Sequence, residues 1–248
     1  MPNWVKNIIR ITGPEEDIAK AIELIRDKDP GCEDRIDFNN IIPRPERLNI
    51  TSGGYDRHYV ALYLKTLSLA KLVDLQNKLS ACPVGYYGNY LKKYAEAFMM
   101  DVPKETIKRM TETLDTEYKD LDAASLEEVG KAYIDNILEY GDDTWYEWNC
   151  RHWGTKWNPT EGRLFDDELE FETAWSAPFP VIAALSRTFP KLVFTHEWAD
   201  ENLGFNCGRS EVARGAVTAN YGFESDDEAY KFACSLWCCD PEEMEEEE

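Results

Sequence analysis

The chain has 248 residues, which is enough for one large domain or two small ones with a proper hydrophobic core. Its net charge of −21 argues against binding to bare nucleic acid or to an anionic membrane, because both would repel it. An aromatic content of 12%, with eight Trp, excludes an acidic disordered chain.

The N-terminal sequence lacks the basic segment and apolar run of a secretory signal peptide, and no stretch approaches the ~18 consecutive apolar residues of a membrane-spanning helix. The seven cysteines are odd in number and scattered, unlike a secreted disulfide framework. We therefore expect a cytoplasmic protein (in a host cell) with reduced thiols and no membrane partner.

The first segment, residues 1–45, predicts a β-α-β unit. Apolar residues fall on both faces of residues 3–12, which indicates a central strand. A helix follows Pro14, with a single apolar stripe of Ile18, Ile22 and Ile25. Residues 36–42 are apolar at both ends and are followed by Pro43, so we expect a second strand there.

The middle of the chain, residues 46–143, predicts a helical insertion. Helical spacing of apolar residues appears in residues 57–81 and 104–122. Ser125 and Glu128 have the spacing of a capping box, which predicts the start of another helix.

The pattern changes to period two in residues 169–175, which predicts a half-buried strand. Ser176 is a candidate cap for the helix that follows, and residues 192–198 alternate again as a further strand. Residues 203–221 predict a hairpin, and Ser225 with Glu228 forms a capping box before a short helix.

Two β-α-β units predict an α+β fold: a ferredoxin-like split β-α-β sandwich with an antiparallel sheet, interrupted by a helical insertion and extended by a C-terminal hairpin and helix. The predicted parts are residues 1–45 (first half), 46–143 (insertion), 144–223 (second half with the hairpin) and 224–248 (short helix and acidic tail). The last part carries eleven acids and one base, which indicates a solvated tail or an arm that binds a basic partner.

Four of the eight tryptophans lie within residues 145–157. One interpretation is structural: the rings seal the insertion against the sheet, with each indole N–H bonded to a partner. The other is a ligand pocket walled by aromatic rings and lined with a few polar groups. The candidate ligand-binding residues are Trp148, Asn149, Trp153, Thr155, Lys156, Trp157 and Trp175.

The sequence resembles the YubB-type ferredoxin-like proteins of phages and conjugative plasmids. The resemblance rests on Pro2-Asn3-Trp4, on Ile41-Ile42-Pro43 with Pro45, and on the segments around Trp145 and Trp148-Asn149, Trp153 to Trp157, Thr173 to Ser176 with Pro178, and Phe189-Pro190. Val5 and Ala177 depart from the residues common in that family, and residues 49–140 match no part of it. The resemblance implies the fold and a mobile-element origin; it implies no activity and no catalytic residues.

Catalytic and metal-binding patterns are weak. Cys234, Cys238 and Cys239 lack a fourth ligand nearby, and no Gly-rich phosphate loop with its Lys-Ser/Thr is present. His152 follows Cys150 by two positions, a spacing that does not by itself place the two groups within hydrogen-bond reach. We therefore predict no catalytic residues, no metal and no cofactor.

These observations favour an acidic accessory protein, encoded by a phage or plasmid, that acts by protein–protein contact and inhibits a host nucleic-acid-binding defence enzyme. Its partner would be a host protein with a basic surface, because complementary charge steers association. One alternative is a small-ligand-binding protein or enzyme that uses the Trp-lined cleft. A second is a module for single-stranded nucleic acid, since ferredoxin-like sheets often stack bases on exposed aromatic side chains.

Overall fold

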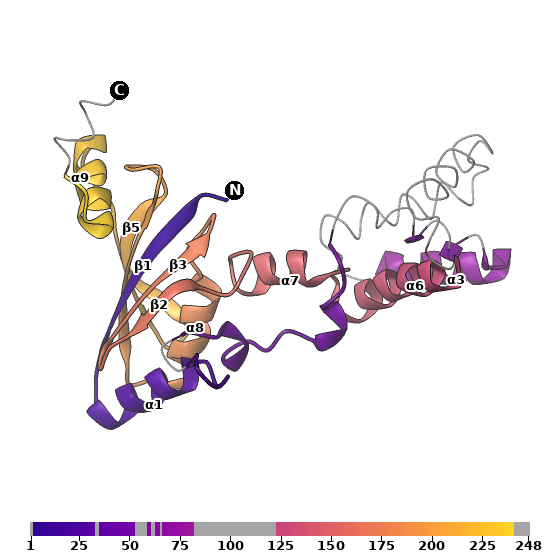
Figure 1. The fold of residues 1–248 in the computed structure, drawn as a ribbon, viewed down its shortest axis with the longest axis horizontal. Coiled ribbons are helices and arrows are strands. Elements are labelled where there is room, and N and C mark those ends of the chain that lie inside the picture. Colours follow the sequence, from indigo (N-terminus) through magenta and orange to yellow (C-terminus); the bar gives the residue numbers. More distant parts are fainter. Residues whose placement is uncertain are drawn as a thin grey trace. The chain divides into compact units, whose positions relative to one another are not determined.

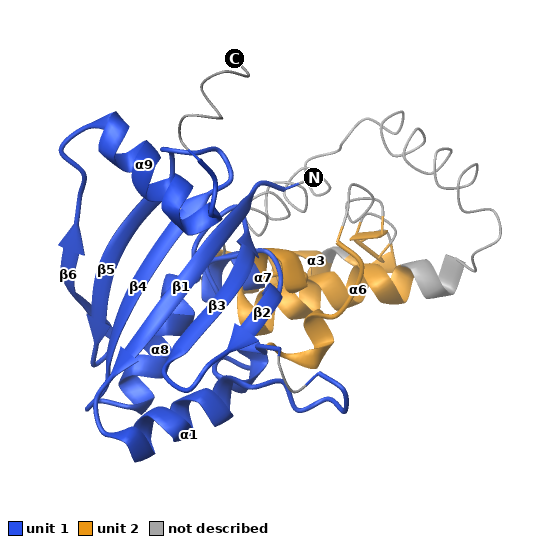
Figure 2. Ribbon diagram, turned by 60° about the vertical axis from the view of Figure 1, so that its left-hand side comes forward, with its two compact units in different colours: residues 1–43, 149–248 blue, residues 44–148 orange. Residues whose placement is uncertain are grey.

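The computed structural model describes residues 2–32, 35–52, 59–60, 63–64, 66–81 and 123–240. The chain divides into two compact units (Figure 2). Unit 1 consists of residues 1–43 and 149–248, and unit 2 of residues 44–148.

Unit 1 is built on a six-stranded sheet with the strand order β2-β3-β1-β4-β5-β6, and each neighbouring pair is antiparallel. Figure 2 labels all six strands, and Figure 1 shows the same sheet from another side. The strands are β1 (Trp4–Thr12), β2 (Thr160–Leu164), β3 (Glu168–Ala174), β4 (Val193–Asp200), β5 (Cys207–Ala213) and β6 (Ala216–Tyr221). The predicted central strand is confirmed, because β1 lies between β3 and β4 and has apolar residues on both faces.

Helices pack on both faces of this sheet. Phe179, the first residue of α8 (Phe179–Thr188), packs edge-on against His196 and Trp198 of β4, and we call this side the α8 face. α9 (Asp226–Trp237) packs on the opposite side, the α9 face, where Ala233 and Leu236 meet Ala199 of β4. The predicted capping box is confirmed, since the Ser225 hydroxyl accepts a hydrogen bond from the backbone N–H of Glu228.

The order of elements in unit 1 is that of a ferredoxin-like fold. Along the chain, β1, α1 (Glu15–Ile25), β2, β3, α8 and β4 follow one another as β-α-β-β-α-β, with unit 2 inserted between α1 and β2. β3 and β4, joined by α8, flank β1, while β5 and β6 extend the sheet beyond β4. The predicted α+β, ferredoxin-like fold with an antiparallel sheet is therefore confirmed.

One predicted strand was wrong. Within residues 36–42 only Ile36 forms an isolated bridge, to Arg26, and Phe38–Asn40 is a 3₁₀ turn. The Asp37 carboxylate caps that turn by accepting a hydrogen bond from the backbone N–H of Asn39, so a side chain competes with a strand ladder at this point. The second strand of the ferredoxin-like order is instead β2, which lies beyond the insertion and was not predicted.

Unit 2 is a small helical core. It contains the 3₁₀ turn Glu46–Leu48, α3 (Leu69–Ala81) and α6 (Ala123–Tyr140), and α7 (Trp145–His152) runs from this unit into unit 1. A hydrophobic cluster in this unit consists of the buried residues Val60, Leu64, Leu75, Leu79, Tyr133, Ile134 and Ile137.

Two of the helix predictions for this region need correction, and a third is not tested. α6 begins at Ala123, so Ser125 lies inside the helix and is not its cap. The helix predicted for residues 57–81 is interrupted at Leu67 and Ser68, while the one predicted for residues 104–122 lies outside the described residues. Among the helices that the structure describes, none is both long and apolar enough to cross a bilayer.

Candidate functional site

The segment from Trp153 to Trp157 leaves α7 and holds three distant parts of unit 1 together. Trp153 is only 1% exposed, and its ring packs edge-on against Phe38 at a centroid distance of 5.9 Å. Its indole N–H donates a hydrogen bond of 2.9 Å to the carbonyl oxygen of Ile42. This side chain therefore fixes the loop that replaces the predicted second strand.

The polar neighbours of Trp153 are also bonded within the chain. The Thr155 hydroxyl donates to the carbonyl oxygen of Ala174 at 2.9 Å, and the Asn149 amide donates to that of Lys156 at 2.8 Å. Both side chains are buried. The Thr155 bond secures the segment to the end of β3, and the Asn149 bond joins α7 to the segment itself.

Ser176 does not cap α8, contrary to the prediction. The N-cap position is Pro178, which makes no side-chain cap, and the Ser176 hydroxyl donates to the carbonyl oxygen of Gly154 at 2.5 Å. Gly154, whose carbonyl oxygen accepts this bond, has a φ of +81°. Trp148, the remaining buried candidate, belongs to unit 2 and is 5% exposed.

The other candidates lie together at one end of the sheet. The Lys156 ammonium lies 4.2 Å from the ring centroid of Trp157 and 4.8 Å from that of Trp175, within the range of cation–π contacts. Trp157 also packs against Trp4 at the start of β1, with a centroid distance of 6.2 Å.

Trp175 is unusual in both exposure and backbone conformation. It is 42% exposed and has a φ of +70°, a conformation that bulky residues seldom adopt. Its carbonyl oxygen accepts a hydrogen bond of 3.2 Å from the Asn206 amide, which brings the Phe205 loop beside it. Phe205 itself is 68% exposed. We call Trp4, Lys156, Trp157, Trp175 and Phe205 the tryptophan patch.

Carboxylates accompany this patch on the α9 face of the sheet. The pKa of Glu172 is raised, first by burial and then by repulsion from Glu161, Glu201 and Glu170, with Lys6 acting in the opposite direction. Glu201 follows β4, and its backbone N–H bonds to the carbonyl oxygen of Trp4 at 2.8 Å. We call Glu161, Glu170, Glu172 and Glu201 the acidic patch.

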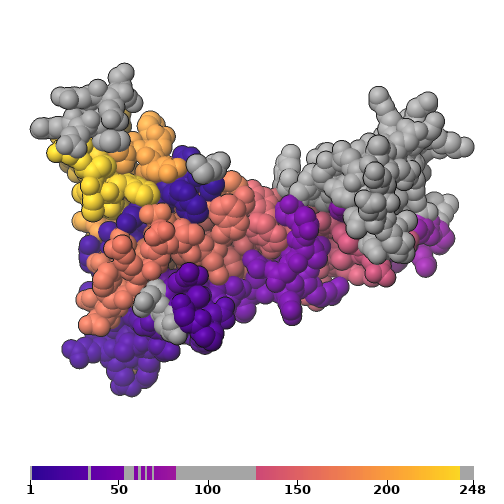
Figure 3. Space-filling model, in the orientation of Figure 1, coloured from indigo at the N-terminus to yellow at the C-terminus, as the bar shows by residue number. Residues whose placement is uncertain are grey.

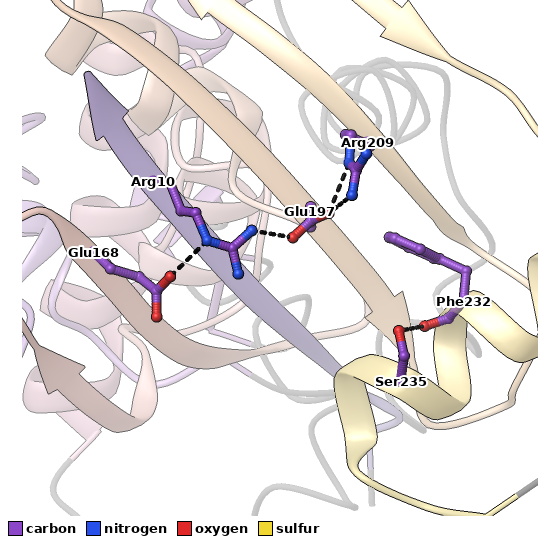
Figure 4. A network of polar contacts seen from close by, with 6 residues as sticks. All are labelled: Arg10, Glu168, Glu197, Arg209, Phe232 and Ser235. Carbon is purple, nitrogen blue, oxygen red and sulfur yellow. Dashed lines mark hydrogen bonds and ion pairs between the residues drawn. The ribbon is translucent and has the colours of Figure 1, made fainter. Parts of the chain in front are cut away.

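A charge network that sequence reasoning missed crosses the α9 face (Figure 4). The side chain of Glu197 is only 6% exposed, and both of its carboxylate oxygens are bonded to arginines. Arg10 on β1 donates to it at 2.7 Å and also pairs with Glu168 at 2.8 Å, while the Nε of Arg209 on β5 donates to Glu197 at 2.6 Å. The hydrogen bond to Glu197 raises the pKa of Arg10.

A second missed network is buried on the α8 face. The Asn7 amide nitrogen donates to the carbonyl oxygen of Val5 at 2.8 Å and to the Thr173 hydroxyl at 2.9 Å. The Asn7 amide oxygen lies 3.0 Å from Nε2 of His196 and can only accept, so Nε2–H donates the hydrogen bond between them. Complete burial lowers the pKa of His196 to about 3, so the ring is neutral near pH 7. The sequence signal that could have revealed this network was Asn7, a polar residue on the buried face of the predicted central strand.

No group of three or more His, Cys, Asp or Glu side chains among the described residues is arranged to hold a metal ion. The exposed groups at this end of the sheet are aromatic rings, an ammonium group and carboxylates. Such groups are suited to non-covalent binding of a partner.

The match to a family model supports the fold. Residues 152–248 match the family model described as the ferredoxin-like domain in Api92-like protein. A solved structure, the protein api92 from Yersinia pseudotuberculosis, is similar over 91% of this chain and 99% of its own, with 12% identity and a TM-score of 0.40. Among curated proteins none matches.

Proposed function

We propose that this chain acts by protein–protein contact through the tryptophan patch, and that its partner has a basic surface. The observation that carries the proposal is Trp175, a large apolar side chain held in solvent at a φ of +70°. Such backbone strain persists where the surrounding structure enforces it, often at functional sites. Tryptophan is also among the residues that contribute most to binding energy at protein interfaces.

Charge supports the basic character of the partner. The acidic patch lies on the face that carries Trp4, and the segment 224–248 contains eleven acids and one base. α9 lies within this segment and packs on β4, β5 and β1. Figure 3 shows this part of the chain, in yellow, at the surface of unit 1. Complementary charge speeds association and disfavours acidic competitors.

More specifically, we propose that the chain is an accessory protein, encoded by a phage or plasmid, that inhibits a host nucleic-acid-binding defence enzyme. The support for this form is the resemblance of the sequence together with the net charge of −21. A nucleic-acid-binding enzyme carries the basic groove with which such a charge would associate.

The two alternatives receive less support. The Lys156 ammonium lies over the rings of Trp157 and Trp175, so a ligand between those rings would have to displace it. To bind single-stranded nucleic acid by base stacking, the inner strands would need exposed aromatic rings on the part of the sheet that no helix covers. Apart from Trp4 at the start of β1, the side chains there include the ion-paired Lys6, Arg10 and Glu170.

The proposal is tested with the full chain as bait against lysate of the host cell, at about 50 mM and about 500 mM salt. Three baits are compared: the wild type, Trp175→Ala and Phe165→Ala. Phe165 is a matched control because it is also an exposed aromatic residue, 48% exposed, and lies outside the patch. Proteins that differ between baits are then purified and their affinities measured directly.

We expect a basic protein to be retained by the wild type and by Phe165→Ala at low salt, and to be lost with Trp175→Ala and at high salt. Retention that is unchanged in Trp175→Ala would contradict the role of the patch. The absence of any basic protein at low salt would contradict the charge of the partner. Binding of single-stranded nucleic acid at about 50 mM salt would favour the second alternative.

A further inference from the structure

A cleft opens at the β2 edge of the sheet in unit 1. Its lining includes Glu161 of the acidic patch but no residue of the tryptophan patch. Its volume is about 510 Å³, which is within the usual range for small-ligand sites. The residues that line it are Arg35, Pro159, Thr160, Glu161, Gly162 and Arg163.

The two arginines of this cleft form no ion pair with any residue that the structure describes, unlike Arg10, Arg26 and Arg209 of the same unit. Arg163 faces Glu170 across the β2–β3 ladder, yet the Glu170 carboxylate is bonded to Lys6 at 2.5 Å. Glu161 also lines the cleft, but neither guanidinium group is paired with it or with another carboxylate that the structure describes. In a chain with a net charge of −21, both groups are therefore available to an external anion.

An irregularity of β2 brings these groups to one place. The ladder between β2 and β3 shifts register between Thr160 and Arg163, and Glu161 within the shift has a φ of +50°. Bulges of this kind redirect side chains and are common beside functional sites. A Cβ atom placed on Gly162 would lie 3.5 Å from the backbone nitrogen of Ile36, so β2 runs close beside the segment that carries Arg35.

We propose that this cleft binds a small molecule that carries a phosphate group. A phosphate monoester has a charge of about −1.5 to −2 near pH 7, which matches two arginines better than a single carboxylate does. Guanidinium groups bind phosphate oxygens through paired N–H donors, and the Thr160 hydroxyl adds a further donor to the lining. The volume of the cleft leaves room for the rest of the molecule beside the phosphate.

The test is a titration of the full-length, isotopically labelled chain with inorganic phosphate at constant ionic strength, followed through the backbone amide signal of Gly162. Acetate is titrated in parallel as a monoanion. The variants are Arg163→Ala, Arg35→Ala and Arg187→Ala. The last is the matched control, because Arg187 is also exposed and forms no ion pair with a described residue, but lies on α8.

We expect a saturable shift of the Gly162 signal with phosphate and a weaker response to acetate. Arg163→Ala and Arg35→Ala should each weaken phosphate binding at least about tenfold, the loss typical of a charge-assisted hydrogen bond, and Arg187→Ala should leave it unchanged. A shift that does not saturate, or equal weakening in Arg187→Ala, would overturn the proposal. If Arg163→Ala fails to fold, Arg35→Ala decides alone, since it alters a loop outside the sheet.

Discussion

Trp153 and Ile42 lie 111 positions apart in the chain and are joined by a hydrogen bond of 2.9 Å from the indole nitrogen to the backbone carbonyl oxygen. The contact connects the two segments of unit 1 that flank the insertion. It gives the Trp153 ring a structural role, because a buried carbonyl oxygen without a donor costs free energy.

Trp153→Phe should therefore destabilise unit 1 by about 1–3 kcal/mol, because phenylalanine retains much of the apolar ring but cannot donate to Ile42. The measurement is the free energy of unfolding by urea titration. Trp175→Phe is the control and should change stability by less than about 0.5 kcal/mol, since that ring is 42% exposed. Equal losses in the two variants would refute the role assigned to the hydrogen bond.

Gly154→Ala should also destabilise the chain, by about 1–3 kcal/mol, for a steric reason. Gly154 has a φ of +81°, and a Cβ atom there would lie 2.8 Å from Cδ of Pro180. Gly222→Ala is the matched control, since a Cβ atom at that position meets nothing within 4 Å. Thermal denaturation should show a lower midpoint for Gly154→Ala alone; a similar midpoint for both variants would argue against the clash.

The burial of His196 predicts a loss of stability in acid. The unfolded chain takes up a proton on this ring below its ordinary pKa of 6.5, whereas the folded chain resists protonation down to a pKa of about 3. The free energy of unfolding should therefore fall by up to about 1.4 kcal/mol per pH unit as the pH decreases from 6.5 toward 3. Above pH 6.5 the ring is neutral in both states and contributes no pH dependence.

The variant His196→Gln isolates this contribution from that of the many carboxylates, because glutamine does not titrate. The difference in unfolding free energy between wild type and variant should be constant from pH 7 to 8. Below pH 6.5 it should shift in favour of the variant. A difference that stays constant down to pH 4.5 would mean that His196 takes up its proton in the folded protein as readily as in the unfolded chain.

Glu197→Gln should reduce stability by about 1–3 kcal/mol, because two arginines lose their charged acceptor on a side chain that is 6% exposed. The matched control is Glu23→Gln, which breaks the exposed pair between Glu23 and Arg26 and should change stability by less than about 0.5 kcal/mol. Urea titrations of both variants would test this. A loss in the control as large as that in Glu197→Gln would show that burial does not strengthen the network.

The elements that sequence alone determined are those whose periodicity is local. β1, β3, β4, α8 and α9 each carry an apolar face that can be recognised within about ten residues, and Ser225 with Glu228 marks the start of α9. These elements were sufficient for the ferredoxin-like α+β fold. The clustering of tryptophans in residues 145–157 placed Lys156 and Trp157, together with Trp175, among the candidate residues. Sequence could not tell which of the candidates would be buried.

Tertiary structure decided the features that depend on distant partners. The five residues of β2 are partly charged, include a glycine and do not alternate, so their strand conformation comes from pairing with β3; residues 36–42 look more apolar yet have no such partner. Glu197 is buried because arginines 187 positions before it and 12 after it reach across neighbouring strands. Local sequence patterns show which face of a segment is apolar. Residues far apart in the chain determine which strands pair, and the burial of charged side chains follows from that pairing.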